Sequence, residues 1–145
     1  MAEHVWTVIC RRALVDETTK VPSLIDIVEG FDVFGTEDIE APAAFPLELA
    51  VVTQWARSDA DIPEMARHRL NILGPKSPEV SPQLPEVAVD LTSGRFHRTT
   101  FAMQGFPNYG IGDYSMLIEL LVGGEWIVAK TLTITVRRKP LGEAH

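Results

Sequence analysis

Gly112-Asp113-Tyr114-Ser115-Met116-Leu117-Ile118-Glu119-Leu120 is the stretch that decides the fold of this chain. Turn-forming residues open it, and from Tyr114 onward every second residue is apolar. A period of two is typical of a β-strand with one buried face. The stretch therefore predicts a strand whose inner face begins with Tyr114.

The position of Tyr114 suggests more than burial. A tyrosine at the start of a strand, directly after a glycine turn, resembles the tyrosine corner of immunoglobulin-type sandwiches. In that motif the ring joins the core and the hydroxyl bonds nearby backbone. We therefore expect a largely buried Tyr114 whose hydroxyl is bonded to backbone or to ordered water.

A hairpin at Gly123-Gly124 follows, and its register is open to two descriptions. Directly paired residues share a face of the sheet. A plain two-residue loop would place Tyr114 opposite Thr133 and turn the apolar residues of the second strand away from the core. A three-residue loop, or an equivalent bulge near Ala129-Lys130, would instead pair Tyr114 with Ile134. Burial favours the second description, because a one-residue slip moves every side chain to the other face.

The rest of the chain repeats the strand pattern between turn signals and shows no amphipathic helix. Gly30 interrupts one strand and predicts a bulge or bend. We expect one domain over residues 1–145: an all-β, two-sheet antiparallel β-sandwich, immunoglobulin-like or C2-like, with eight or nine strands and a frayed tail at 140–145. Besides the hairpin, the predicted strands are 4–15, 23–34, 46–57, 65–73, 86–92 and 95–104.

Composition limits the partners of the protein. Thirteen basic and twenty acidic residues give a net charge of −7, which disfavours attraction to nucleic acid and to anionic lipid. No apolar run is long enough for a membrane span, and no secretory signal is evident. The single cysteine, Cys10, allows no intrachain disulfide, which suits a reducing compartment. We therefore expect a cytoplasmic protein that binds neither nucleic acid nor membrane.

Two N-terminal stretches carry a resemblance. His4-Val5-Trp6-Thr7-Val8-Ile9-Cys10, followed by Ser23-Leu24-Ile25-Asp26-Ile27-Val28-Glu29, is similar to a family of small uncharacterised bacterial proteins. The resemblance implies a β-sandwich of nearly this length. It implies no activity, because that family has no assigned one.

The sequence predicts no catalytic, cofactor-binding or metal-binding residue. Asp59, Asp61 and Glu64 share a loop, but without a second acidic loop they are typical of a solvated turn. Cys10 lies in an apolar strand that indicates a buried, inert thiol. The four histidines show no zinc-ligand spacing.

Partner binding is the remaining class of function. Trp126, Phe106 and Tyr109 lie near a hairpin tip or in a loop, where aromatics often recognise partners and equally often plug the end of a core. Arg67 and Arg69 share an outward face. With Arg95, His97 and Arg98 they would form a basic strip if the two strands were neighbours, and otherwise they belong to a mixed surface.

Two functions fit these observations. The first is a non-catalytic binding or assembly module that acts on a protein partner through a sheet edge or the aromatic loops. The alternative is a small hydrolase or metal-dependent enzyme with a site assembled from distant residues, such as His68 or His97 with a carboxylate. The absence of catalytic motifs favours the module.

The last strand predicts a homodimer as one form of assembly. Lys130 is its only charge between Ile127 and Val136, so the strand has few of the charges that guard sheet edges. Trp126 could anchor the contact. A strand lying inside the sheet, between the Tyr114 strand and the N-terminal strand, would explain the missing charges equally well.

Overall fold

The computed structural model describes residues 1–34, 44–76 and 85–139, so the predicted tail at 140–145 lies outside the described residues. Eleven strands occur in the described part of the chain, and no helix does. No segment described there could therefore cross a membrane as a helix. The strands are β1 (Glu3–Val15), β2 (Pro22–Ile27), β3 (Gly30–Phe34), β4 (Ala44–Phe45), β5 (Leu49–Ala56), β6 (Glu64–Leu73), β7 (Val87–Leu91), β8 (Phe96–Met103), β9 (Phe106–Pro107), β10 (Gly112–Val122) and β11 (Glu125–Lys139).

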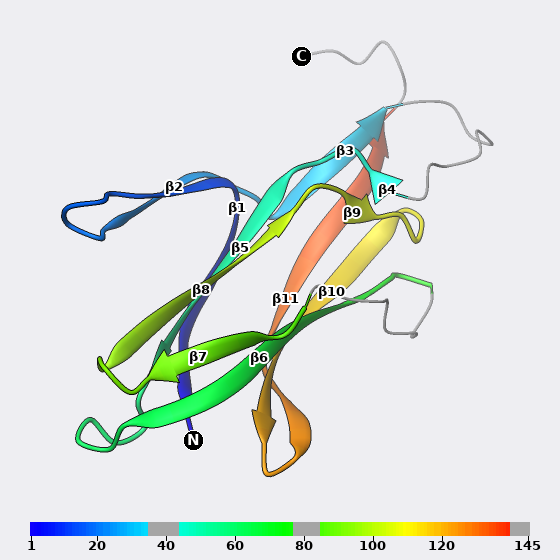
Figure 1. Cartoon of the computed structure of the whole chain (residues 1–145). Helices are drawn as coiled ribbons and strands as arrows, with labels where there is room; N and C mark the ends of the chain where they lie inside the picture. The colour runs from blue at the N-terminus through cyan, green and yellow to red at the C-terminus, as the bar shows by residue number, and fades with distance from the viewer. Residues whose placement is uncertain (35–43, 77–84, 140–145) are drawn as a thin grey trace.

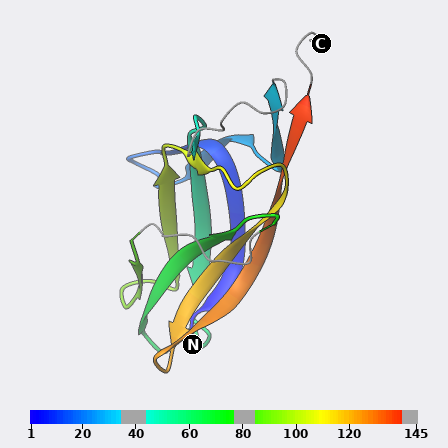
Figure 2. The same ribbon diagram turned by 90° about the vertical axis from the view of Figure 1, so that its right-hand side faces the viewer.

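Two main sheets enclose the core. One has the strand order β2-β1-β5-β8 and the other β3-β11-β10-β6-β7, while β4 and β9 form a small third sheet. Figures 1 and 2 show the two main sheets as facing layers. Alternate side chains from both layers form one buried cluster, in which Trp55, Val89, Phe106, Ile118 and Ile134 have no exposed surface. The prediction of an all-β chain is confirmed, and the layers are consistent with a sandwich. Two of the strands are only two residues long.

The predicted strand 23–34 is in fact two strands in different sheets. The N–H of Val28 donates to the carbonyl of Ile9 in the first sheet, 2.8 Å away, whereas the carbonyl of Glu29 accepts from the N–H of Thr135 in the second, 3.2 Å away. The chain thus changes sheets between two consecutive residues. Gly30 allows this, because a Cβ there would lie 2.5 Å from the carbonyl oxygen of Thr135.

The strand after this crossover corrects the expectation of a purely antiparallel sandwich. β3 pairs with β11 in parallel, from Gly30 opposite Thr135 to Phe34 opposite Lys139. A parallel neighbour cannot come from a tight hairpin. Here it comes from the crossover, which brings β3 to the second sheet in the same direction as β11.

The β10–β11 hairpin combines a two-residue loop with a bulge. Gly123 and Gly124 have φ angles of +58° and +82°, the left-handed conformation that a tight hairpin requires at both positions. The register then shifts between Ile118 and Glu119, leaving Ala129 as an extra residue in β11. Tyr114 is opposite Ile134 as a result. Of the two descriptions given by the sequence, the equivalent bulge is the one found.

Tyr114 forms the predicted corner. Its side chain is buried, and its hydroxyl accepts a hydrogen bond from the N–H of Tyr109 at 2.7 Å and donates one to the carbonyl of Gly110 at 2.6 Å. The ring packs against Phe106 with 5.0 Å between ring centroids. One side chain therefore fixes the loop before β10 to the core.

Cys10 lies in a second, smaller cluster on the outer face of the β2-β1-β5-β8 sheet. Its buried side chain contacts Ala50 and Val52, and its Sγ lies 3.6 Å from the carbonyl oxygen of Ala50. Leu24, from the β1–β2 hairpin, packs against this cluster. Burial raises the pKa of the thiol, although a backbone hydrogen bond from Arg12 opposes the shift.

Replacing Tyr114 by phenylalanine should destabilise the protein by about 2 kcal/mol, because two partly buried backbone groups lose their hydrogen-bond partner. Chemical denaturation measures this change. Tyr109→Phe is the matched control and should stay within about 0.5 kcal/mol of the wild type. Equal stability of wild type and Tyr114→Phe would show that the hydroxyl does not hold the loop.

The thiol of native Cys10 should react slowly with a thiol reagent at neutral pH, because the sulfur is buried and its thiolate is disfavoured. The rate of labelling in native buffer, compared with the rate in denaturant, tests this. Equal rates in the two conditions would contradict a buried, inert thiol.

Candidate functional site

One side of β11 is largely uncovered. The strand pairs with β10 over Glu125–Val136, but β3 covers only Thr135–Lys139. Over Glu125–Ile134 no strand in the described part of the chain pairs with its other side. We call this segment the open edge. The prediction that the last strand could lie inside the sheet is thus correct only for its C-terminal end, and its neighbour there is β3 rather than the N-terminal strand.

The backbone of the open edge has a defined orientation. The N–H of Thr135 donates toward β3, to the carbonyl of Glu29. Since the polar groups of successive strand residues point to alternate sides, Thr133 and Thr131 direct theirs to the same, uncovered side. Those of Leu132 and Ile134 point to β10. The open edge therefore presents a row of backbone donors and acceptors to solvent.

β1 flanks the same side of the molecule. β2 pairs only with Cys10–Val15 of β1, so the preceding part of β1 has β5 as its only paired strand among those described. Figures 1 and 2 show this part of β1 and the start of β11 near the N-terminus. A pocket of about 420 Å³ lies between them, lined by Met1, Ala2, Glu3, His4, Leu120, Val122, Ile127, Val128 and Ala129.

The side chains of the open edge that face inward by their register with β10 are Glu125, Ile127, Lys130, Leu132 and Ile134. Ile127, Lys130 and Leu132 are opposite the buried Leu120, Ile118 and Met116 of β10, and paired residues share a face. Ile127 is nevertheless 45% exposed, Lys130 is exposed and Leu132 is half-buried. From Ile127 to Leu132 the inward face of the open edge is therefore apolar, charged and apolar in turn.

Lys130 carries the charge in the middle of this stretch. No carboxylate of the described residues lies within ion-pair distance of it. Burial, and then the positive charge of Lys130, lower the pKa of His4 on β1. The positive charge of Lys130 therefore affects a side chain of the opposite sheet, His4, across the open side. The imidazole of His4 is held by a 2.7 Å hydrogen bond between its Nε2 and the hydroxyl of Thr7.

The outer face of the same sheet brings two predicted residues together. Glu119 is buried there, and its carboxylate accepts hydrogen bonds from Arg69 Nε at 2.6 Å and from Asn71 Nδ2 at 2.8 Å. The guanidinium of Arg69 lies 4.2 Å from the centroid of the Trp126 ring. Tryptophan and arginine are enriched among the residues that dominate binding energies, and here Trp126 of the open edge is in contact with Arg69, which reaches it from β6 across β10.

The other predicted aromatics do not join this surface. Phe106 has no exposed surface and its ring packs on Phe31 and Tyr114, so its prediction as a partner-binding residue is wrong. The alternative that loop aromatics plug the end of the core describes it correctly. Tyr109 is half-buried and stacks on Tyr114 at 6.3 Å between ring centroids.

Arg67 is exposed and forms an ion pair with Glu86, 3.0 Å between nitrogen and oxygen. The basic strip considered from the sequence does not form. Arg67 and Arg69 lie on β6, whereas His97 and Arg98 lie on β8 of the other sheet. The mixed, charge-balanced surface is the correct description.

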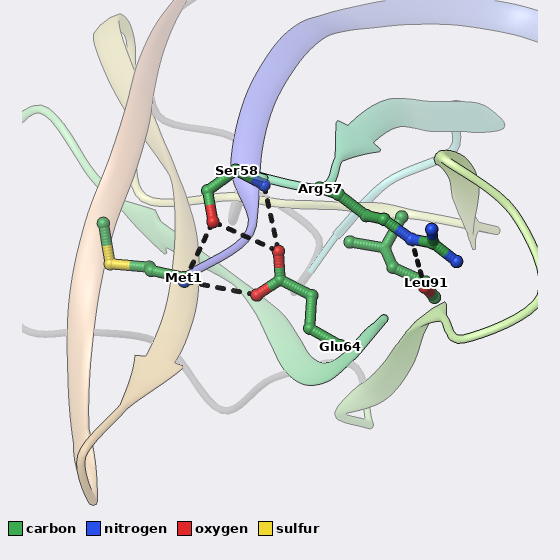
Figure 3. Close-up of polar contacts among 5 residues, drawn as sticks. All are labelled: Met1, Arg57, Ser58, Glu64 and Leu91. Atoms are coloured by element: carbon green, nitrogen blue, oxygen red, sulfur yellow. Dashed lines mark hydrogen bonds and ion pairs between the residues drawn. The ribbon is translucent and has the colours of Figure 1, made fainter. Parts of the chain in front are cut away.

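Polar contacts hold the loops at the ends of β5 and β7, close to the N-terminus (Figure 3). Glu64 accepts a 3.0 Å hydrogen bond from the N–H of Ser58 and lies 3.2 Å from the amino group of Met1. Arg57 donates to the carbonyls of Leu91, Ala60 and Thr92. These charged groups therefore stabilise the conformation of the loops. Among the described residues, no three histidine, cysteine or acidic side chains are grouped to hold a metal ion.

His68 is buried in the core between aromatic rings. Its ring centroid lies 5.0 Å from that of Trp55 and 4.9 Å from that of Phe101, and its Nδ1 is 3.3 Å from the carbonyl oxygen of Glu119. Burial lowers the pKa of His68 to about 4. The imidazole is therefore neutral at neutral pH.

An exposed apolar hairpin was not predicted as a surface. The β1–β2 hairpin is tied to β8 through a 2.8 Å hydrogen bond from Arg98 to the carbonyl of Lys20. Its own apolar side chains remain exposed, with Ile27 at 64%. In the sequence, the two strands of this hairpin carry apolar residues on both faces, and this pattern could have indicated an exposed apolar surface. The exposed residues are Leu14, Val15, Val21, Ile25 and Ile27.

Comparison with known proteins adds no identification. Neither a family model nor a curated protein matches the chain. The resemblance of the N-terminal stretches to a bacterial family therefore stays a prediction, and the geometry above is the basis for a function.

The amide hydrogens of Thr131 and Thr133 should exchange with solvent much faster than those of Leu132 and Ile134, because only the latter two face β10. Amide hydrogen exchange followed by NMR measures the four rates. Thr135, bonded to Glu29, is the control and should be protected. Protection of Thr131 in a monomeric sample would mean that the edge is covered.

The stability of the protein should fall by up to about 3 kcal/mol as the pH is lowered from about 6.5 to about 4. In this interval the unfolded chain binds a proton at His68 and the folded chain does not, since the folded pKa is about 4. The contribution is fully present above the unfolded pKa. Chemical denaturation across this pH range should show a weaker dependence for His68→Phe, and an unchanged dependence would exclude His68 as its source.

Proposed function

We propose that this protein is a non-catalytic binding or assembly module that takes an extended segment of a protein partner as an added strand along the open edge. The observation that carries this proposal is the uncovered side of Glu125–Ile134, whose backbone groups have no partner strand in the described part of the chain. Strand addition uses such groups for affinity and alternate side chains for specificity.

The surroundings of the open edge support binding rather than a passive surface. Trp126 lies on its outer face, in contact with Arg69 of β6, and a pocket lies on its inner side. An added strand would therefore contact Trp126 with one face and an apolar pocket with the other. Central apolar or aromatic anchors with polar surroundings are the usual composition of binding surfaces.

The partner class follows from charge and from the pocket. A net charge of −7 supports a protein partner over nucleic acid or anionic lipid. The pocket is lined by neither His68 nor His97, the histidines on which the enzyme alternative depended. The corner formed by Tyr114 supports an immunoglobulin-like sandwich over a C2-like one as the finer fold type.

Thr131→Pro should abolish partner binding without unfolding the protein. The N–H that the substitution removes points to the uncovered side, so no ladder hydrogen bond is lost, while the ring blocks an added strand. The tagged wild type and variant, recovered from native cells after cross-linking, would be compared by mass spectrometry. A partner retained by the wild type and lost by Thr131→Pro is the expected result.

Thr100→Pro is the matched control on the other sheet. The N–H of Arg57 donates to the carbonyl of Arg95, and in the register of β5 and β8 this directs the N–H of Thr100 to the free side of β8. Thr100 is exposed, as Thr131 is. The control should keep the partner. A partner that is kept by both proline variants, with both folded by circular dichroism, would contradict binding at the open edge.

Self-association tests the homodimer predicted from the sequence. If the open edge pairs with a second copy, sedimentation at micromolar concentration should show a dimer that Thr131→Pro and Trp126→Ala dissociate. A monomer of 16.1 kDa would exclude the homodimer and leave the edge to a different protein.

A further inference from the structure

We infer that the segment bound at the open edge carries an acidic residue flanked by apolar residues at alternate positions: apolar, any, acidic, any, apolar. This inference rests on the proposed function and specifies the chemistry of its partner. It is carried by three successive inward side chains of the open edge, Ile127, Lys130 and Leu132, and by the pocket beside them.

The spacing follows from the bulge. Ile127, Lys130 and Leu132 are opposite Leu120, Ile118 and Met116, which are successive inward residues of β10. The extra residue Ala129 therefore brings Lys130 into the inward row, about 7 Å from its neighbours at the rise of a β-strand. A strand added to β11 would place inward side chains at the same interval, that is, at every second residue.

Apolar side chains fit the two ends of this row. Ile127 is 45% exposed and lines the pocket together with Leu120 and Val122 of the same sheet and Ala2 of the other side. Leu132 is half-buried against the core. Covering each of these with an aliphatic side chain would contribute through burial of apolar surface, at roughly 25 cal/mol per Å².

The middle position requires a negative charge. A strand that covered Lys130 with an apolar side chain would remove the ammonium group from water without a partner, which is costly. Lys130 has no ion-pair partner among the residues described, and its charge acts on His4 across the open side. A carboxylate at this position would pair with the ammonium and lie near the imidazole.

The same lysine argues against a second copy as the occupant. Inward-pointing charges and bulges are the devices by which sheets discourage edge-to-edge pairing of identical chains, and Lys130 and Ala129 supply both. The one acidic residue of the inward row, Glu125, is opposite Val122 and directly follows the turn at Gly123-Gly124. In a second copy that placed Glu125 against Lys130, this turn would lie where one of the two apolar side chains is required. A different segment can supply a carboxylate with an apolar residue on both sides.

A displayed library of short random peptides tests the inference. The library would be selected on the wild-type protein after depletion on Thr131→Pro, so that only peptides that need the open edge are kept. We expect the apolar-any-acidic-any-apolar pattern among them. A peptide carrying it should bind Lys130→Glu about tenfold more weakly than wild type, and lysine in place of its acidic residue should restore binding to Lys130→Glu.

Lys20→Glu is the control, because it makes the same charge change at the exposed turn of the β1–β2 hairpin; it should leave peptide binding unchanged. Peptides that need the open edge but lack the acidic residue, or that ignore Lys130→Glu, would overturn this inference and leave the proposed function standing. No peptide that distinguishes wild type from Thr131→Pro would overturn both. A wild-type dimer that occupies the edge and resists every peptide would assign the edge to a second copy and overturn the inference.

Discussion

The constraint on which the rest of the second sheet depends is the alternation of side chains along β11. The two-residue turn at Gly123-Gly124 starts the strand in a register that would turn its apolar residues outward, and the extra residue Ala129 corrects it. After that correction Ile134 and Val136 are buried in the core, and before it Trp126 faces the outer surface. One inserted residue therefore lets the same strand bury Ile134 and Val136 in the core while Trp126 faces the outer surface.

Two charged residues on the neighbouring strands β10 and β11 differ in how their charge is compensated. Glu119 lies on the outer face but is buried, and Arg69 and Asn71 satisfy its carboxylate within the chain. Lys130 lies on the inner face but is exposed, and no described carboxylate pairs with it. A buried charge is tolerated when it is paired and hydrogen-bonded, which is true of Glu119. Lys130 stays hydrated only because the sandwich is open there.

Local pattern was sufficient for the features that neighbouring residues determine. The strands, the corner at Tyr114 and the buried Cys10 follow from period-two alternation and from turn residues. The crossover between Val28 and Glu29 did not, because a strand alternates in the same way whichever sheet it joins. The contact of Trp126 with Arg69 also depends on distant pairing, since β6 and β11 meet on either side of β10. Glu119 was a signal in the sequence that the predictions did not use. A single carboxylate in an apolar strand needs a cation from a neighbouring strand.

The parallel pairing of β3 with β11 has a consequence for how the chain reaches this structure. Asp32 and Arg137, which form an ion pair across it, are 105 residues apart in the sequence. Contacts between such distant residues slow folding, because the loop that joins them must close first. On the ribosome, β3 emerges early and has no strand to pair with in its own sheet until Thr135–Lys139 has been synthesised. The five-stranded sheet therefore completes only after β11 has been synthesised, and until then the backbone groups of β3 lack the strand with which they pair in the folded protein.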